Sequence, residues 1–172
     1  AADEKAVPLY TRCGFHPVKS FRFIVDASFY KKSGPSSVQV RLTLDELLKH
    51  KRESLPLQSK VAAIGEEHIL AFYYVHGFDR CIHSLSEDLL VLMEMEGTDL
   101  HLYDVFSRKS YALEHILESI TPDHAEKIIC HFTPQENLKG LSLEEDTGAG
   151  WMIRSSVELS LPEAFTFPDI SK

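Results

Sequence analysis

Nine histidines give this 172-residue sequence its first candidate chemistry, because imidazole is a common metal ligand. Two of them, His68 and His76, stand eight residues apart in one predicted helix and so lie roughly on one face. Zinc sites on helices instead place histidines three or four residues apart. We therefore interpret these histidines as polar or helix-cap positions, and the sequence predicts no metal site.

Three other groups of reactive side chains are also interpreted as structural. His101 and Asp104 share a predicted strand, where their odd spacing predicts opposite faces. Cys130 and His131 are neighbours on a strand that we predict to be buried, so their side chains should diverge rather than form a nucleophile and its base. The acidic stretch "SLEEDTG" (142–148) lacks the alternating spacing of a calcium loop and is interpreted as a solvated loop.

The overall charge excludes two classes of partner. Eighteen Lys and Arg against 26 Asp and Glu give a net charge of -8, which argues against a nucleic-acid groove or an anionic membrane surface.

Cys13, Cys81 and Cys130 are too widely spaced for a CxxC zinc site and too few for a disulfide framework. The sequence shows no apolar run of about 18 residues and no signal-peptide pattern. We expect a cytoplasmic protein.

The first half of the sequence mixes predicted strands and helices. Thr43, three residues before Glu46, forms a capping box that begins a helix. Gly34 and Pro35 among serines are typical of a turn. The expected elements are a helix ending at Gly14, a strand over 18–30, a turn over 31–37, a strand over 38–43, a helix toward Lys51 and a mostly buried helix over 66–76.

The second half contains the clearest pattern. "DLLVLMEMEG" and "DLHLYDVF" are two alternating runs separated by a Gly-Thr turn, which predicts a β-hairpin. After it we expect an amphipathic helix over 110–120, a buried strand over 126–134, a short strand over 150–156 and a tail, 161–171, that lies over the core. Hairpins without strict strand–helix alternation predict an α+β fold, with a mixed, mostly antiparallel sheet and flanking helices.

The opening stretch "DEKAVPLYTRCGF" is a short predicted helix that stops at a glycine. It resembles the late helix motif of the GNAT superfamily of acyl-coenzyme A-dependent N-acyltransferases, which commonly shows an Asn, a small residue, Leu-Tyr and then Gly-Phe. Asp3 stands at the place of the Asn, and the residues on the pattern are Ala6, Leu9, Tyr10, Gly14 and Phe15. The resemblance implies a GNAT-like fold.

The same resemblance implies site residues. In the family the tyrosine is the usual general acid for the thiolate leaving group, and its helix lies beside the pantetheine arm. It therefore implies that Tyr10 is catalytic and that Asp3 and Ala6 contact acetyl-coenzyme A. The chemistry is sound, because an amine that attacks a thioester expels a thiolate that a phenol can protonate. Without the resemblance, Tyr10 would be interpreted as a half-buried packing residue with its hydroxyl in water.

One defining motif of the family is missing from this sequence. GNAT proteins hold the coenzyme A pyrophosphate in a Q/R-x-x-G-x-G/A turn that precedes the tyrosine helix. The one GxG here, Gly148 and Gly150, lies in the acidic context "EEDTGAGW". Because residues 60–172 also resemble the second lobe of two-lobed bacterial GNAT-like proteins, we expect the C-terminal part of such a protein. Residues 1–30 would end its catalytic lobe, and residues 38–172 would form a degenerate second lobe.

The resemblance implies that the chain is part of an N-acyltransferase that moves an acyl group, most simply acetyl, from coenzyme A to a small-molecule primary amine. By itself the chain should be inactive and bind no cofactor. The alternative is a non-catalytic GNAT-like module for oligomerisation or small-ligand binding. An unpaired edge on the strand at 18–30 would favour self-association, so we expect a homo-oligomer.

Overall fold

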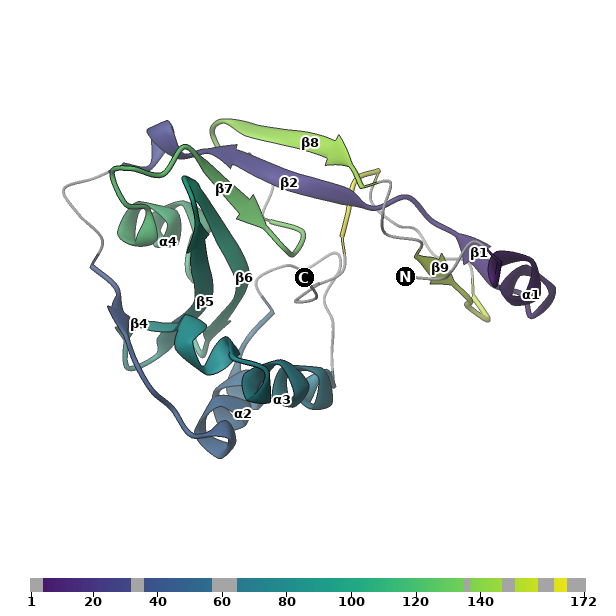
Figure 1. Ribbon diagram of the computed structural model, residues 1–172, viewed down its shortest axis with the longest axis horizontal. Coiled ribbons are helices and arrows are strands. Elements are labelled where there is room, and N and C mark those ends of the chain that lie inside the picture. Colours follow the sequence, from purple (N-terminus) through teal and green to yellow (C-terminus); the bar gives the residue numbers. More distant parts are fainter. Residues whose placement is uncertain are drawn as a thin grey trace.

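The computed structural model describes residues 5–31, 36–56, 65–134, 137–146, 151–157 and 163–166. Its strands are β1 (His16–Pro17), β2 (Phe21–Asp26), β3 (Val38–Gln39), β4 (Ile82–Ser86), β5 (Leu89–Glu96), β6 (Asp99–Ser107), β7 (Lys127–Cys130), β8 (Leu141–Glu145) and β9 (Met152–Ile153). Seven of them form one sheet in the order β3-β4-β5-β6-β7-β2-β8, and β1 pairs with β9 in a small separate sheet (Figure 1).

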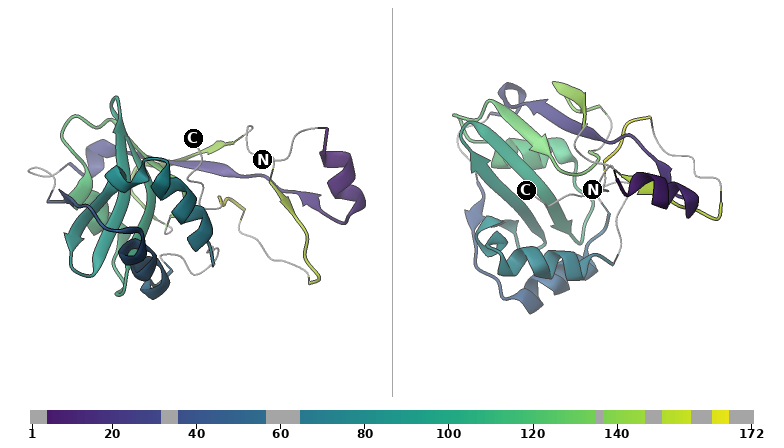
Figure 2. Two further views of the ribbon diagram at one scale, coloured as in Figure 1. Left: turned by 60° about the horizontal axis from the view of Figure 1, so that its bottom comes forward. Right: turned by 45° about the vertical axis from the view of Figure 1, so that its right-hand side comes forward.

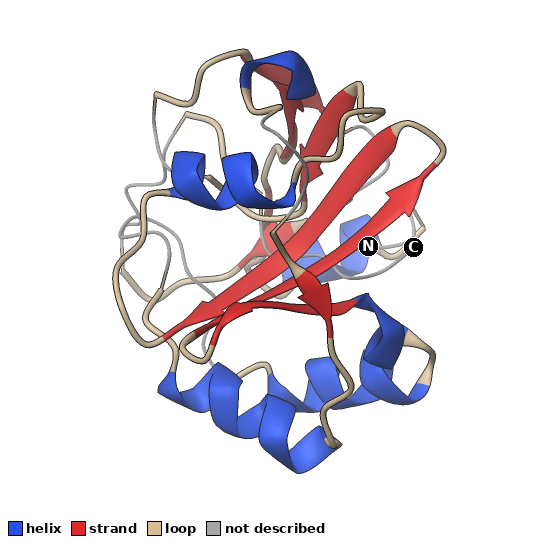
Figure 3. Ribbon diagram, turned by 90° about the vertical axis from the view of Figure 1, so that its left-hand side faces the viewer, coloured by secondary structure: helices blue, strands red, loops and turns tan. Residues whose placement is uncertain are grey.

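Helices cover both faces of the large sheet (Figure 3). On one face, α2 and α3 pack over β4, β5 and β6, and on the other face α4 packs over the centre of the sheet. The helices are α1 (Val7–Arg12), α2 (Leu44–Glu53), α3 (Glu67–Val75) and α4 (Leu113–Ile120), with short 3₁₀ turns η1 (Ala27–Phe29) and η2 (Phe78–Cys81).

The amphipathic helix α4 explains the larger of the two apolar cores. Its buried residues are Leu113, Ile116, Leu117 and Ile120, which follow the i, i+3, i+4, i+7 spacing of a single helix face. This face packs against the inward side chains of β2, β5, β6 and β7. The second core, centred on Leu47 of α2 and Leu70 of α3, lies on the opposite face of the sheet.

The predicted fold class is confirmed by the strand directions. Among the described strands, β6 and β7 form the one parallel pair, and all other neighbouring strands in the two sheets pair in antiparallel fashion. The helix α4 connects the two parallel strands, as such a crossover requires. The protein is therefore an α+β fold with a mixed, mostly antiparallel sheet.

The predicted hairpin forms, but with a bulge that the sequence pattern does not show. Gly97 takes a φ of 63° in the two-residue turn, which suits the hairpin. Leu92 pairs with Asp104 while Met93 pairs with Leu102, so Tyr103 is the extra residue of a β-bulge. The bulge reverses the alternation of side chains along β6. The prediction that His101 and Asp104 face opposite sides is therefore wrong, because both lie on the face covered by α2 and α3.

The strand predicted over 18–30 is shorter and lies inside the sheet. Strand β2 ends at Asp26, whose side chain accepts a 2.8 Å hydrogen bond from the Ser28 N–H and caps η1. Both of its edges are paired, one with β7 and the other with β8. This segment therefore offers no free edge, contrary to our expectation. Strand β2 shares one sheet with the later strands, and the division of the chain into lobes over residues 1–30 and 38–172 stays a prediction.

Strand β8 corrects another prediction. The acidic stretch interpreted as a loop is mostly a strand, which pairs with β2 at the edge of the sheet. Gly140 leads into it with a φ of 71°, and a Cβ there would meet the Phe29 ring at 2.6 Å. Only glycine fits this close approach. Residues 147–150, which carry the GxG, lie outside the described residues.

Several boundaries also differ from the predictions. The capping box of Thr43 and Glu46 forms and begins α2, but the strand before it is reduced to β3. Helix α3 is not mostly buried, because Leu70 is the one buried residue among the described residues of this helix. Of the predicted tail, residues 163–166 are described, and Phe165 in it is buried, as expected. Among the described residues, no helix is both long and apolar enough to cross a lipid bilayer.

Candidate functional site

The end of α1 explains the spacing of Tyr10, Gly14 and Phe15. The Phe15 N–H donates to the Tyr10 carbonyl and the Gly14 N–H donates to the Thr11 carbonyl, both at 3.0 Å, which is the Schellman pattern. Gly14 takes the required positive φ of 82°. The Tyr10 and Phe15 rings meet edge to face at 5.7 Å, which is the apolar contact that usually accompanies this motif. The motif thus has a structural role whether or not it is catalytic.

The residues implied by the resemblance lie along this short helix. Tyr10 is 39% exposed. Ala6 is the N-cap, and its carbonyl accepts hydrogen bonds from the Leu9 and Tyr10 N–H groups at 3.0 Å. Pro8 fits in the first turn, where its missing N–H is not needed. Asp3 lies outside the described residues. Tyr10 and the N-cap Ala6 therefore belong to one short helix segment, and their contact with a cofactor stays a prediction.

Helix α1 belongs to an arm that projects from the large sheet (Figures 1 and 2). The arm consists of α1, β1 and β9, and is held by the two-residue pairing of β1 with β9. Arg154 stacks on the Phe15 ring, with 5.0 Å from its guanidinium carbon to the ring centroid, and its Nη1 donates to the Cys13 carbonyl at 3.5 Å. In the part of the chain that the structure describes, α1 contributes no buried residue.

A second candidate site lies where β6 ends and α4 begins, because ligands of α/β units often bind at the carboxyl end of parallel strands. A pocket of about 130 Å³ lies there, lined mainly by Leu55, Pro56, Tyr111 and the end of β6. The Leu55 N–H donates to the Ser107 carbonyl at 2.7 Å, so the segment after α2 covers the end of the strand. The pocket is well below the 300–1,000 Å³ of usual small-molecule sites.

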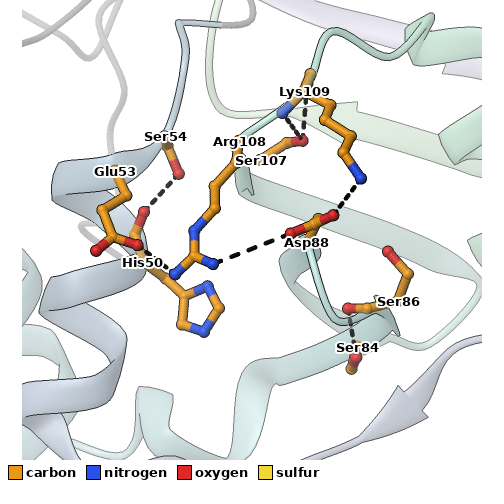
Figure 4. A network of polar contacts seen from close by, with 9 residues as sticks. All are labelled: His50, Glu53, Ser54, Ser84, Ser86, Asp88, Ser107, Arg108 and Lys109. Atoms are coloured by element: carbon orange, nitrogen blue, oxygen red, sulfur yellow. Dashed lines mark hydrogen bonds and ion pairs between the residues drawn. The ribbon is translucent and has the colours of Figure 1, made fainter.

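The cations next to this pocket are already paired (Figure 4). Arg108 forms ion pairs with Glu53 and Asp88, and Lys109 hydrogen-bonds to Asp88. The hydrogen bond from Lys109, reinforced by its charge, lowers the pKa of Asp88, and the same contact raises the pKa of Lys109. The buried Ser107 hydroxyl donates to the Lys109 carbonyl at 2.7 Å. The network closes this corner of the fold and leaves little positive charge for a phosphate.

The structure also brings together two histidines that the sequence interpretation did not consider as a pair. His101 Nδ1 and His131 Nε2 lie 2.9 Å apart, because the His131 N–H bonds to the Leu102 carbonyl as the chain leaves β7. Glu96 Oε2 lies 3.6 Å from His101 Nε2, and the Tyr103 ring packs on both imidazoles. No local spacing marks this pair. Among the described residues, no three His, Cys, Asp or Glu side chains are placed to hold a metal ion.

The cysteines should differ in how fast they react with a thiol reagent. Cys13 is exposed on the arm, whereas burial raises the pKa of the Cys130 thiol to about 12. We expect an aromatic disulfide reagent at pH 8 to modify Cys13 rapidly and Cys130 only after unfolding, because the thiolate is the reactive form. Mass spectrometry of the labelled peptides measures the order. Cys13→Ser should remove the fast phase, and rapid labelling of Cys130 in the native protein would contradict the described packing.

Comparison with known proteins supports the fold. No protein-family model and no curated protein matches the chain. Among solved structures, it resembles a GCN5-related N-acetyltransferase from Kribbella flavida with a TM-score of 0.50 and 13% identity, over 80% of this chain and 39% of that one. It also resembles a conserved protein of unknown function from Enterococcus faecalis V583, described as a probable N-acyltransferase, with a TM-score of 0.52 and 11% identity, over 84% of this chain and 41% of that one.

These likenesses confirm the GNAT-like fold that the opening motif implied. The chain spans about two fifths of the length of each of these structures. At such low identity the likeness concerns the fold, and it transfers no residue role.

Proposed function

We propose that the chain is part of an acyl-coenzyme A-dependent N-acyltransferase, which transfers an acyl group, most simply acetyl, to a small-molecule primary amine. The observation that carries the proposal is the arm. Tyr10 stands there on a helix that the described residues leave exposed, in the helix–Gly14–β1 arrangement that the GNAT motif implied. An exposed helix bearing Val7, Leu9 and Tyr10 suits packing against a neighbouring catalytic lobe.

In this proposal Tyr10 protonates the thiolate that leaves when the amine attacks the thioester. Ala6, the N-cap of α1, and Asp3 would contact the bound acetyl-coenzyme A. The large sheet, from β2 onward, would act as the degenerate second lobe and support the catalytic one. All three cysteines are free thiols, which fits a reducing compartment, and we propose the cytoplasm.

The 172-residue chain alone should bind acetyl-coenzyme A weakly or not at all. The sequence lacks the glycine turn, the pocket beside α4 is about 130 Å³, and Arg108 and Lys109 are paired with carboxylates. Isothermal titration calorimetry measures the affinity directly. Micromolar binding would show a phosphate site in this chain and would contradict the assignment of the large sheet to a degenerate lobe.

The second candidate function is a non-catalytic module that mediates oligomerisation. Its support is an apolar stripe on the outer face of α3, where Ile69, Phe72 and Val75 follow each other at three-residue spacing and are exposed. The strand β8 adds an exposed sheet edge with Leu143. Both features suit contact with a second copy of the chain.

If that alternative holds, the chain should be a homodimer in which α3 is covered. Light scattering coupled to size-exclusion chromatography should then give twice the mass of 19.5 kDa, and Phe72→Glu should return the chain to a monomer. Asp123→Asn, in the exposed turn between α4 and β7, serves as the surface control. A monomer at high concentration would count against this function, while leaving the role proposed for Tyr10 unaffected.

A further inference from the structure

The outer face of helix α3 combines apolar side chains with two histidines. Within the described residues of this helix and its C-cap, the exposed ones are His68, Ile69, Phe72, Val75 and His76. Their three- and four-residue spacing places them along one stripe. The stripe contains no Asp, Glu, Lys or Arg, although 26% of the chain is charged and the exposed face of a helix is usually polar. Histidine protonation therefore sets the charge of this face.

The residue types in the stripe are symmetric about Phe72. Ile69 and Val75, both branched aliphatic residues, stand three positions to each side of it. His68 and His76 stand four positions to each side. A twofold axis beside Phe72 would place a second copy of α3 antiparallel to the first, so that each residue meets a residue of its own type. This is the self-complementarity that a twofold interface requires, and antiparallel helix dipoles favour the same orientation.

We propose that α3 pairs with α3 of a second copy in antiparallel orientation, and that His68 and His76 make this pairing pH-dependent. The proposal rests on the second candidate function, the oligomerisation module, and adds its arrangement and its regulation. Ile69, Phe72 and Val75 are 38%, 56% and 68% exposed, so the pairing removes apolar surface from water in both copies. Each His68 lies opposite His76 of the other copy. Acid therefore places like charges opposite each other in the interface.

The charge on His76 arises next to the centre of the stripe. Its Nδ1 lies 2.7 Å from the Phe72 carbonyl, which only accepts, so Nδ1 carries a proton and acid adds the second proton at Nε2. The imidazole also packs on the Phe72 ring, with 4.2 Å between centroids. The charged residues near this end of α3 are Asp79 and Arg80 of η2 and Glu94 of β5.

The carboxylates near His68 are already paired with cations. The charged residues around this end of α3 are Lys51 and Arg52 of α2, Glu66 and Glu67 beside His68, and Asp104 of β6. Lys51 Nζ lies 4.0 Å from Glu66 and 2.7 Å from Asp104, and Arg52 lies 4.0 Å from Glu67. A charged His68 therefore adds positive charge to the interface.

The first test measures the dimer Kd of the 172-residue chain by sedimentation equilibrium at about pH 8 and about pH 6. The Kd should be about tenfold or more higher at the lower pH. The sequence pI is 5.6, so the net negative charge falls over this range and general repulsion between copies decreases. Net charge alone would therefore strengthen the dimer, and weakening is specific to groups in the interface.

The outcomes of this test separate the proposal from the function on which it rests. A monomer at pH 8 would overturn both. A dimer that is equally tight or tighter at pH 6 would overturn the proposal and leave the oligomerisation module in place.

The second test assigns the pH dependence to the two histidines. The double variant His68→Gln/His76→Gln should dimerise equally well at both pH values. The matched control His115→Gln/His124→Gln removes two exposed histidines outside α3 and should keep the loss of affinity at pH 6. Circular dichroism checks the fold of both variants. The same pH dependence in the two double variants would overturn the role of His68 and His76.

The third test examines the antiparallel arrangement by disulfide cross-linking in a Cys13→Ser background. Ile69→Cys/Val75→Cys should form a covalent dimer under mild oxidation, because each cysteine lies opposite the other one in the second copy. Val75→Cys alone should not, since its two copies are offset by about 9 Å along the helix axis and a disulfide bridges Cα atoms less than about 7 Å apart. Cross-linking of Val75→Cys alone, or none in the double variant, would overturn the arrangement.

Discussion

If the chain is part of the proposed acyltransferase, replacing Tyr10 by phenylalanine is expected to lower its kcat by about 10²- to 10⁴-fold, the usual range for a general acid. The substitution deletes the hydroxyl and keeps the ring. The edge-to-face contact with Phe15 and the backbone bonds that close α1 do not need the hydroxyl, so the free energy of unfolding should barely change. The KM for acyl-coenzyme A should also change little. Steady-state kinetics with both substrates varied measures these effects.

Phe15→Leu is the matched control. It removes the ring contact on Tyr10 and the stacking of Arg154, but it leaves the phenol in place. It should therefore loosen the arm without the loss in kcat that is specific to the hydroxyl. If Tyr10→Phe lowers kcat less than about tenfold, water protonates the thiolate, and Tyr10 is the packing residue of a Schellman motif.

Replacing Leu102 by alanine is expected to lower the free energy of unfolding by about 2–5 kcal/mol. Leu102 is 0% exposed, at the point where β6 pairs with both β5 and β7. Alanine would leave a cavity in the core beneath α4, where close-packed neighbours can relax only in part. Since domains of this kind are stable by about 5–15 kcal/mol, the loss would be a large fraction of the total. Urea unfolding followed by circular dichroism measures it.

Leu143→Ala is the control for this substitution. Leu143 is also a leucine on a strand, but it is 49% exposed on the edge strand β8, and its truncation should cost no more than about 0.5 kcal/mol. A similar cost for the two variants would mean that the sheet is not ordered as described. A small effect of both would show that the core on the α4 side does not carry the stability of the chain.

The sequence by itself determined the features that depend on neighbouring residues. The capping box of Thr43 and Glu46, the Gly97 hairpin and the amphipathic face of α4 each arise from contacts within a few residues. The glycine stop after Tyr10 is of the same kind. Such contacts leave a periodic or positional signal that a single sequence displays. The resemblance of the opening motif added the expectation of a GNAT-like fold, which the structural comparisons support.

The tertiary structure decided what depends on residues far apart in the chain. Strand β8 is acidic and looks like a loop, yet it forms because β2 supplies its hydrogen-bonding partners. The bulge at Tyr103 places His101 and Asp104 on one face, and the pairing of β6 with β7 brings His101 against His131. A surface pocket lined by Tyr73, Phe78 and Glu94 likewise joins α3, η2 and β5. These features depend on strand pairing and packing between residues that are far apart in the sequence. The tendency of a segment to form a strand depends more on this tertiary context than on its local sequence.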